Sequence, residues 1–192
     1  MIYRYFIDPL LSGVRESIKK EIEQGSSCLD IACGTGDMVF RLMDHCTSVT
    51  GIDMNEAAIK SAQKRVDIKG LDHLSFKLQD ATNMADYVDN EFDYSIISLA
   101  IHQFDPELRA GIILEAKRVS KTIIIADYST PMPKTAAGKL AEFIEFLAGK
   151  QHNGNFKHYQ ATGGIKAQLD SLGLTMVEKR KNGRGVFTVV AV

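Results

Sequence analysis

The chain lacks the features that mark membrane and secreted proteins. None of its apolar runs approaches the roughly 20 residues that a membrane-spanning helix needs, and a signal peptide is not expected, because Arg4 stands among aromatic residues in the first few positions. Only three cysteines occur, too few for a disulfide framework, so we interpret them as reduced, small apolar residues. We therefore expect a cytoplasmic protein without a membrane span.

The chain also lacks an excess of charge of one sign. The formal net charge is −1 over 192 residues, so no global field attracts nucleic acid, and nucleic acid is not expected as a partner. The five histidines are scattered without ligand spacing, so no metal site is predicted. Repeats and low-complexity segments are absent from the sequence as well.

What is present is ordinary for a compact domain. Hydrophobic residues make up 45% and charged residues 24% of the chain, which are typical globular values. A chain of this length buries about 70% of its unfolded surface as one domain. We predict a single domain over 1–192, with an N-terminal helical cap in 1–25 and an inserted, lid-like helix in 130–160.

Strand and helix patterns alternate along the chain. This alternation predicts an α/β fold in which a mostly parallel, doubly wound sheet has right-handed crossovers. The strands are expected at 28–31, 49–52, 74–81, 92–98, 123–128, 174–179 and 186–192. The helices are expected at 9–23, 38–43, 55–69, 105–116, 135–149 and 162–172. A turn at Asn182-Gly183 predicts an antiparallel hairpin between the last two strands.

The most informative segment runs from Cys28 to Asp37, with the sequence CLDIACGTGD. An apolar strand enters a glycine turn, and a helix pattern follows, which is the arrangement that holds a nucleotide-like cofactor at the carboxyl edge of a parallel sheet. Gly34 and Gly36 allow backbone angles closed to other residues. Asp53, at the end of the next strand, is placed to accept both hydroxyl hydrogens of a ribose. The alternative is a glycine turn that merely joins a strand to a helix.

Two nucleoside-binding classes share this skeleton. The dinucleotide fingerprint needs glycine or alanine where this chain has Val39, whose branched side chain argues against that class. The segment instead resembles motif I of the class I S-adenosylmethionine-dependent methyltransferases. In that resemblance Asp30 is the acidic residue of the motif, and Ala32, Gly34 and Gly36 take its three glycine places.

The resemblance extends through most of the chain and implies S-adenosyl-L-methionine as the cofactor. It also implies a Rossmann-like sheet with strand order 3-2-1-4-5-7-6, in which the C-terminal hairpin supplies the antiparallel strand. In this family the residue at the place of Asp80 accepts the adenine amino hydrogen, and the strand that ends at Ser98 lies next to the transferable methyl group. The implied cofactor-binding residues are Asp30, Ala32, Gly34, Gly36, Asp53, Met54, Asp80, Ala81 and Ser98.

The sequence also narrows the methyl acceptor. Methyltransferases that modify adenine or glutamine amides carry an Asn/Asp-Pro-Pro-aromatic run after the fourth strand, whereas residues 98–104 here contain no proline. The segment 127–131, Asp-Tyr-Ser-Thr-Pro, resembles the Glu-Phe-Ser-x-Pro stretch of the ubiquinone/menaquinone-biosynthesis branch. That branch and its relatives methylate carbon, oxygen or nitrogen of quinones, lipids and other metabolites, so a small-molecule acceptor is expected.

Candidate groups on the acceptor side come from loops expected above the methyl group. His102 and Tyr128 are the candidate catalytic residues, because a histidine with a near-neutral pKa can take a proton from a phenol or an amine. Tyr5, His158 and Tyr159 are candidate substrate-binding residues. A structural role is the alternative for four of them: capping or packing at the start of the helix at Asp105 for His102, lid packing for His158 and Tyr159, and anchoring of the terminus for Tyr5.

Two further functions share the predicted half-domain. A NAD-linked oxidoreductase would need the dinucleotide fingerprint and a substrate domain. A non-catalytic S-adenosylmethionine-binding protein would keep motif I and lose the polar and aromatic groups above the methyl group. The sequence favours a methyltransferase over both and does not predict its oligomeric state.

Overall fold

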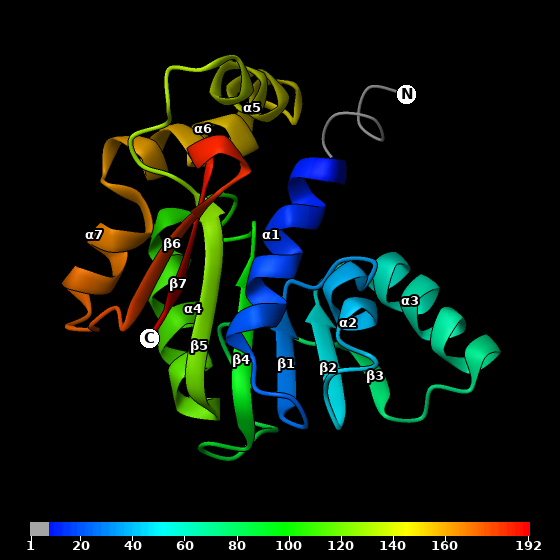
Figure 1. Cartoon of the computed structure of the whole chain (residues 1–192). Helices are drawn as coiled ribbons and strands as arrows, with labels where there is room; N and C mark the ends of the chain where they lie inside the picture. The colour runs from blue at the N-terminus through cyan, green and yellow to red at the C-terminus, as the bar shows by residue number, and fades with distance from the viewer. Residues whose placement is uncertain (1–7) are drawn as a thin grey trace. The chain divides into compact units, whose positions relative to one another are not determined.

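The computed structural model describes residues 8–192 (Figure 1). These residues divide into two compact units. The glycine-loop unit consists of Lys19–Ser98 and Gly111–Ile124. The C-terminal unit consists of 8–18, Leu99–Ala110 and Ile125–Val192. Three elements contribute residues to both units: α1 (Asp8–Glu21), α4 (Pro106–Val119) and β5 (Ser120–Tyr128). That 1–192 forms a single domain stays a prediction.

The glycine-loop unit is built from parallel strands that alternate with helices. Its remaining elements are β1 (Ser27–Ile31), α2 (Asp37–Arg41), β2 (Ser48–Asp53), α3 (Glu56–Lys69), β3 (Leu74–Leu78) and β4 (Phe92–Ser98). β1 pairs in parallel with both β2 and β4, and β2 pairs in parallel with β3. Because parallel strands end at the same edge, the residues that follow these four strands lie along one edge of the sheet.

Local sequence explains where α3 begins and ends. The side chain of Asn55 accepts a hydrogen bond from the amide of Ala58 at 3.1 Å, which satisfies one free N–H group of the first turn. Gly70 ends the helix at φ 62°, a left-handed conformation that glycine adopts without a side-chain clash. Between these caps Ile59, Ala62 and Val66 are buried, so the apolar stripe of the sequence is the packed face of the helix.

The C-terminal unit contains the last helices and the antiparallel strands. Its remaining elements are α5 (Ala136–Leu147), α6 (Lys150–Ala161), α7 (Gly164–Ser171), β6 (Glu178–Asn182), the 3₁₀ turn η2 (Gly183–Gly185) and β7 (Phe187–Ala191). Thr135 caps α5 by accepting a hydrogen bond from the amide of Gly138 at 3.2 Å. β6 and β7 are antiparallel, with Asn182 opposite Phe187.

The seven strands form one sheet in the order β3-β2-β1-β4-β5-β7-β6. This order confirms the strand order 3-2-1-4-5-7-6 that the family resemblance implies. The α/β class, the mostly parallel pairing and the antiparallel C-terminal hairpin are confirmed too. In the described part of the chain, no helix has both the length and the apolar character to cross a membrane.

Two elements differ most from the sequence prediction, and β3, β5 and α4 differ from it by three residues at one end. The segment 150–161 is a separate helix, α6, whereas a single inserted helix was expected between 135 and 149. The sequence KQHNGNFKHYQA gives little helical signal, because it is polar and holds a glycine in its interior. The sixth strand begins at Glu178 and not at Leu174, because pairing with β7 selects the polar segment EKRKN over the more apolar residues before it.

Candidate functional site

The glycine loop between β1 and α2 is closed by backbone hydrogen bonds. The amide of Cys33 donates to the carbonyl of Ile52 at 3.0 Å, and the amide of Gly36 donates to the carbonyl of Cys33 at 2.9 Å. Gly34 and Gly36 have φ values of 54° and 81°, which lie in the left-handed region that glycine tolerates. The loop therefore turns sharply at the carboxyl end of β1, where the sequence places the motif.

Ala32 occupies the place of the motif's first glycine and takes a glycine-like conformation. Its φ is 58°, which costs a residue with a Cβ atom about 1–2 kcal/mol relative to a right-handed conformation. The departure from the family pattern therefore changes the side chain and preserves the backbone path. The chain carries this strain at the loop that forms the motif.

Phe76 of β3 lies against the loop and the neighbouring strand. A Cβ atom at Gly36 would come within 2.3 Å of the Phe76 ring, and one at Gly51 would come within 2.8 Å of both that ring and Cys33 Sγ. The sequence motif predicts a glycine at position 36, but nothing in the sequence predicted that position 51 also requires a glycine. It arises from the packing of an aromatic residue that lies 25 positions further along the chain.

Asp53, at the end of β2, faces the glycine loop. Its Oδ2 accepts a hydrogen bond from the amide of Gly34 at 2.8 Å, and its Oδ1 accepts one from the amide of Asn55 at 2.8 Å. The residue is half-buried, and each carboxylate oxygen has a second lone pair that can accept a further hydrogen bond. The two amides hold the carboxylate beside the loop, in an orientation that leaves acceptor capacity for a pair of hydroxyl groups.

The other predicted cofactor residues also belong to the glycine-loop unit. Asp30 is buried within β1, at 2% exposure, and Ser98 is half-buried at the end of β4. Met54 is exposed directly after Asp53. Asp80 is exposed, and its Oδ1 accepts hydrogen bonds from the amide and the hydroxyl of Thr82; Ala81 follows it and is half-buried. The unit thus brings these residues to the ends of β1, β2, β3 and β4.

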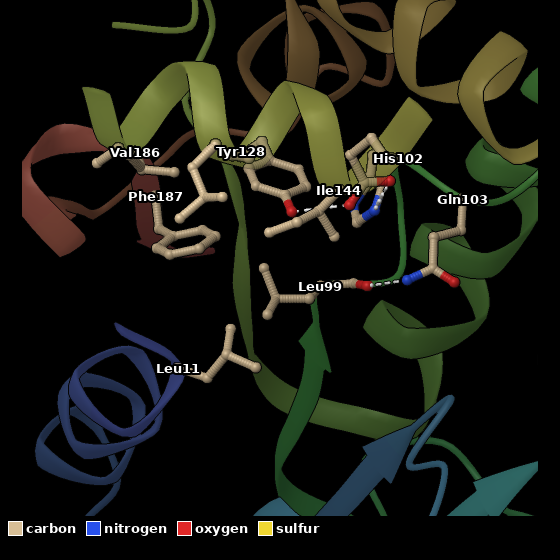
Figure 2. A pocket seen from close by; sticks show the side chains of 12 residues that line it. Leu11, Leu99, His102, Gln103, Tyr128, Ile144, Val186 and Phe187 are labelled. Atoms are coloured by element: carbon tan, nitrogen blue, oxygen red, sulfur yellow. Dashed lines mark hydrogen bonds and ion pairs between the residues drawn. The ribbon is translucent and has the colours of Figure 1, made fainter. Parts of the chain in front are cut away.

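The C-terminal unit holds a small, mainly apolar cavity of about 130 Å³ (Figure 2). Apolar side chains from α1, α5 and the region of β7 form most of its wall, and polar side chains lie along the remainder (Figure 2). The lining residues are Leu11, Leu99, His102, Gln103, Tyr128, Ala137, Leu140, Ala141, Ile144, Glu145, Val186 and Phe187. Of the candidate acceptor-side residues, His102 and Tyr128 line this cavity.

His102 is held by the carboxylate of Asp127. The imidazole Nδ1 donates to Asp127 Oδ1 at 2.6 Å, and the amide of His102 donates to Asp127 Oδ2 at 3.1 Å. The amide of Tyr128 also donates to Asp127 Oδ1, at 2.7 Å. The His102 and Asp127 side chains are 1% and 0% exposed. These bonds orient the ring so that Nδ1 is occupied and Nε2 points away from Asp127.

Glu145 of α5 faces the other side of the His102 ring. Its Oε2 lies 3.5 Å from His102 Nε2 and is also hydrogen-bonded to His152 Nε2. The Tyr128 hydroxyl donates to Glu145 Oε1 at 2.7 Å (Figure 2). Burial lowers the pKa of His102, but Asp127 and Glu145 outweigh it and raise the pKa from 6.5 to about 9. Burial raises the pKa of Glu145, but His102, Tyr128 and His152 outweigh it and bring the pKa below its usual value.

Of the candidate substrate-binding residues, two contact other parts of the C-terminal unit and do not line the cavity, and the third lies outside the described residues. The Tyr159 hydroxyl donates to the carbonyl of Tyr128 and accepts from the amide of Ile165, both at 3.1 Å, and the side chain is fully buried. His158 is exposed, with Nδ1 3.4 Å from Arg109 Nη1. Tyr5 lies outside the described residues. The contacts of Tyr159 favour the lid-packing alternative, and its role in substrate binding stays a prediction.

The sequence did not predict three of the polar residues that surround His102. Asp127, Glu145 and His152 contact His102 or each other, yet they come from β5, α5 and α6. No spacing rule links these positions, since 50 residues separate His102 from His152. The one local signal is that Asp127 is the penultimate residue of a buried strand, where a carboxylate needs a partner.

The glycine loop, the Asp53 carboxylate and the strand order define a class I methyltransferase fold, and comparison with known proteins agrees. The family described as "Methyltransferase domain" matches residues 22–172. The chain therefore belongs to the class I S-adenosylmethionine-dependent methyltransferases, whose cofactor is S-adenosyl-L-methionine.

Curated relatives place the chain near the quinone branch of this family. It is 30% identical to the demethylmenaquinone methyltransferase of Staphylococcus saprophyticus over 147 residues, which are 71% of this chain and 61% of that protein. It is 28% identical to the ubiquinone/menaquinone biosynthesis C-methyltransferase UbiE of Rickettsia bellii over 161 residues, 75% of this chain and 62% of that protein. The chain spans less than two thirds of the length of these relatives.

Solved structures support the fold. The PH0226 protein of Pyrococcus horikoshii superposes with a TM-score of 0.73 at 21% identity, over 98% of this chain and 96% of that chain. A SAM-dependent methyltransferase of Aquifex aeolicus superposes with a TM-score of 0.68 at 17% identity, over 93% of this chain and 88% of that chain. At these identities the likeness concerns the fold alone.

Proposed function

We propose that this chain transfers the methyl group of S-adenosyl-L-methionine to a small, mainly apolar acceptor with one polar group, such as a quinol. The observation that carries the proposal is the Asp53 carboxylate, which both the Gly34 and the Asn55 amides hold beside the glycine loop. The ribose hydroxyls of the cofactor bind this carboxylate. Asp30, Ala32, Gly34, Gly36, Met54, Asp80, Ala81 and Ser98 surround the rest of the cofactor.

The cavity of the C-terminal unit supports an acceptor of this kind. An apolar cavity of ~150 Å³ accommodates a benzene molecule, so a space of about 130 Å³ fits roughly one aromatic ring. The relatives named as demethylmenaquinone methyltransferase and ubiquinone/menaquinone biosynthesis C-methyltransferase point to the same chemical class. The chain leaves the glycine-loop unit at Ser98 and continues at once into Leu99 and His102, which line the cavity.

In the proposed reaction the acceptor's nucleophilic atom attacks the methyl carbon, the bond from that carbon to sulfur breaks, and S-adenosylhomocysteine leaves. Positioning the two reactants contributes up to roughly 7–11 kcal/mol of barrier lowering, and the apolar wall excludes water. His102 and Tyr128 contact the polar group of the acceptor. Because the raised pKa of His102, about 9, keeps that ring protonated at neutral pH, the proton that the acceptor loses passes to the carboxylate of Glu145.

Two experiments test the proposal. Thermal-shift measurements compare S-adenosylhomocysteine, S-adenosylmethionine and NAD, because a ligand of the native state raises the unfolding temperature. Stabilisation by the first two and not by NAD supports the proposal, and stabilisation by NAD alone indicates an oxidoreductase. Incubation with a methyl-labelled donor and a metabolite extract then tests transfer. Binding without any transfer indicates a non-catalytic S-adenosylmethionine-binding protein.

A further inference from the structure

His102, Glu145 and His152 bring three ligand-type atoms together inside the C-terminal unit. The two Nε2 atoms and the Glu145 carboxylate oxygen all lie within 4.8 Å of one another. The side chains of His102 and Glu145 are 1% and 6% exposed, and that of His152 is 24% exposed. Two imidazoles and one carboxylate are a set that binds zinc and other divalent transition metals.

An unsatisfied buried atom points to a ligand at this place. His102 Nε2 is buried and makes no hydrogen bond within the described residues, although Glu145 Oε2 lies 3.5 Å away. Tetrahedral zinc with bonds of 2.0–2.2 Å separates its ligand atoms by roughly 3.3–3.5 Å. The distance between these two atoms therefore fits a shared metal ion. Glu145 and His152 are in direct hydrogen-bond contact, so an ion between them requires the partly exposed His152 side chain to move outward.

The surroundings match those of known metal sites. Metal-bound histidines almost always donate their other ring nitrogen to a carboxylate or carbonyl, which fixes the tautomer, and His102 Nδ1 donates to Asp127 Oδ1 at 2.6 Å. Ligating carboxylates are hydrogen-bonded in turn, and the Tyr128 hydroxyl donates to Glu145 Oε1 at 2.7 Å. Both supporting groups are buried, so the outer shell of a metal site is already in place.

From this geometry we propose that His102, Glu145 and His152 form a binding site for a divalent transition-metal ion of the zinc class. Of the three ligands, His152 also lines a hollow on the surface of the same unit, together with Gln103, Phe104 and Lys150 among others. The nitrogen-rich ligand set excludes magnesium and calcium, which prefer oxygen ligands. Three protein ligands leave a fourth tetrahedral position for water or another oxygen.

The charges of the unit agree with a cation at this point. Asp127 and Glu145 are both buried carboxylates, and buried charges need partners. Arg109 is fully buried in the same unit and interacts electrostatically with Asp127. The partners of Glu145 are the neutral Tyr128 hydroxyl and the two histidines, and a divalent ion between Glu145 and the histidines neutralises its charge. The competing arrangement, which the test must distinguish, is a proton on the histidines in place of the ion.

The use of the ion, unlike its binding, rests on the proposed function. His102 and Glu145 also line the apolar cavity, so the open metal position serves an oxygen atom of the acceptor. When the ion is bound, it takes the place of the His102 ring as the contact to that oxygen. A metal ion lowers the pKa of an oxygen-bound proton, which favours hydroxylated acceptors such as phenols and quinols. Binding of the ion is measured in the absence of methyl donor and acceptor. Absence of metal binding would therefore contradict the metal site alone, whereas absence of S-adenosylhomocysteine binding would contradict the proposed function.

Isothermal titration of the chelator-treated full chain with zinc chloride tests the site. We expect one equivalent to bind, and we expect Glu145→Gln and His152→Gln each to weaken binding by at least 30-fold. The matched controls are Glu142→Gln, an exposed glutamate of α5, and His73→Gln, a histidine of the glycine-loop unit. Both controls should bind zinc within two-fold of the unaltered chain. Magnesium and calcium chloride should give no saturable binding.

Three outcomes would overturn the proposal: no saturable zinc binding, equal binding by the two ligand variants, or equal loss in the controls. Cobalt chloride supplies a second measurement, because the visible spectrum of the cobalt form distinguishes nitrogen and oxygen ligands from cysteine sulfur. A sulfur-to-metal band would assign the ion to the cysteines instead. If Glu145→Gln fails to fold, as shown by circular dichroism, the partly exposed His152→Gln variant decides the outcome by itself.

Discussion

The carboxylate of Asp53 accepts a hydrogen bond from the amide of Gly34 at 2.8 Å, across a sequence separation of 19 residues. This bond joins the end of β2 to the glycine loop that follows β1. It links the two parts of the sequence that predicted a nucleoside site, an acidic strand end and a glycine turn.

The first prediction concerns this carboxylate. Asp53→Ala should weaken S-adenosylhomocysteine binding ten-fold or more, because losing a charged acceptor of hydroxyl hydrogen bonds costs about 1.5–3 kcal/mol. Calorimetric titration measures the affinity, and circular dichroism checks that the fold is retained. Asp72→Ala, which removes an exposed carboxylate of the same unit, is the control and should bind normally. Unchanged affinity in Asp53→Ala would remove this residue from the site.

The second prediction concerns the strain at Ala32. Ala32→Gly should raise the free energy of unfolding by about 1 kcal/mol, because glycine adopts φ 58° without the Cβ penalty. Urea denaturation measures the change, and S-adenosylhomocysteine affinity should stay within two-fold, since the backbone path is the same. Ala58→Gly in the right-handed helix α3 is the matched control and should destabilise by about 0.5–1 kcal/mol. A loss of stability in Ala32→Gly would contradict the strain argument.

The third prediction separates a structural from a substrate-binding role for Tyr159. Tyr159→Phe leaves the buried carbonyl of Tyr128 and the amide of Ile165 without their hydroxyl partner, so it should destabilise the fold by about 1–3 kcal/mol. If the role is structural, KM for the acceptor found by the extract assay stays the same. Tyr94→Phe, at a half-buried tyrosine of β4, controls for the loss of one hydroxyl. A large rise in KM with unchanged stability would assign Tyr159 to acceptor binding.

The fourth prediction concerns acid stability. Lys121, at 2.7 Å, and the amide and hydroxyl of Ser27 lower the pKa of Asp93 from 3.8 to about 2. A lowered folded-state pKa stabilises the fold above pH 3.8, and this contribution is lost as the pH falls through 3.8 towards 2. Because the Asp93 and Lys121 side chains are 36% and 64% exposed, solvent screening keeps the effect small.

Asp93→Asn should accordingly lower the unfolding temperature at pH 7 by about 2–4 °C, the change expected for roughly 1 kcal/mol in a chain of this size. The difference from the unaltered chain should shrink to near zero at pH 2. Differential scanning calorimetry at both pH values measures it, with Asp44→Asn at an exposed site as the control. A difference that persists unchanged at pH 2 would show that the ionised carboxylate is not its cause.

Local sequence predicted the glycine-loop unit well. The strand from Phe92 to Ser98 has the expected bounds, and α3 begins one residue after the start of the helix predicted at 55–69 and ends at Lys69 as predicted. These elements are specified by residues close in sequence: a buried apolar run, a capping side chain and glycines that end a turn or a helix. The strand order followed from the family resemblance, because pairing between strands far apart in the chain leaves no mark in any single segment.

Helix α6 and strand β6 are elements whose secondary structure the local sequence does not predict. The α6 segment is polar and contains Gly154, so its helical state depends on the packing of Phe156 and Tyr159 into the core. Strand β6 consists of polar residues that form a strand because β7 lies alongside. Tertiary contacts outweigh intrinsic propensity in both elements.

The sequence by itself determined the class of protein, because the motif that defines it is ten residues long and its geometry is set by neighbouring bonds. Only the tertiary structure decided which chemistry surrounds His102. Asp127, Glu145 and His152 reach that ring from a strand and two helices. Folding determines their distances, since the chain between them is free to take many paths until the elements pack.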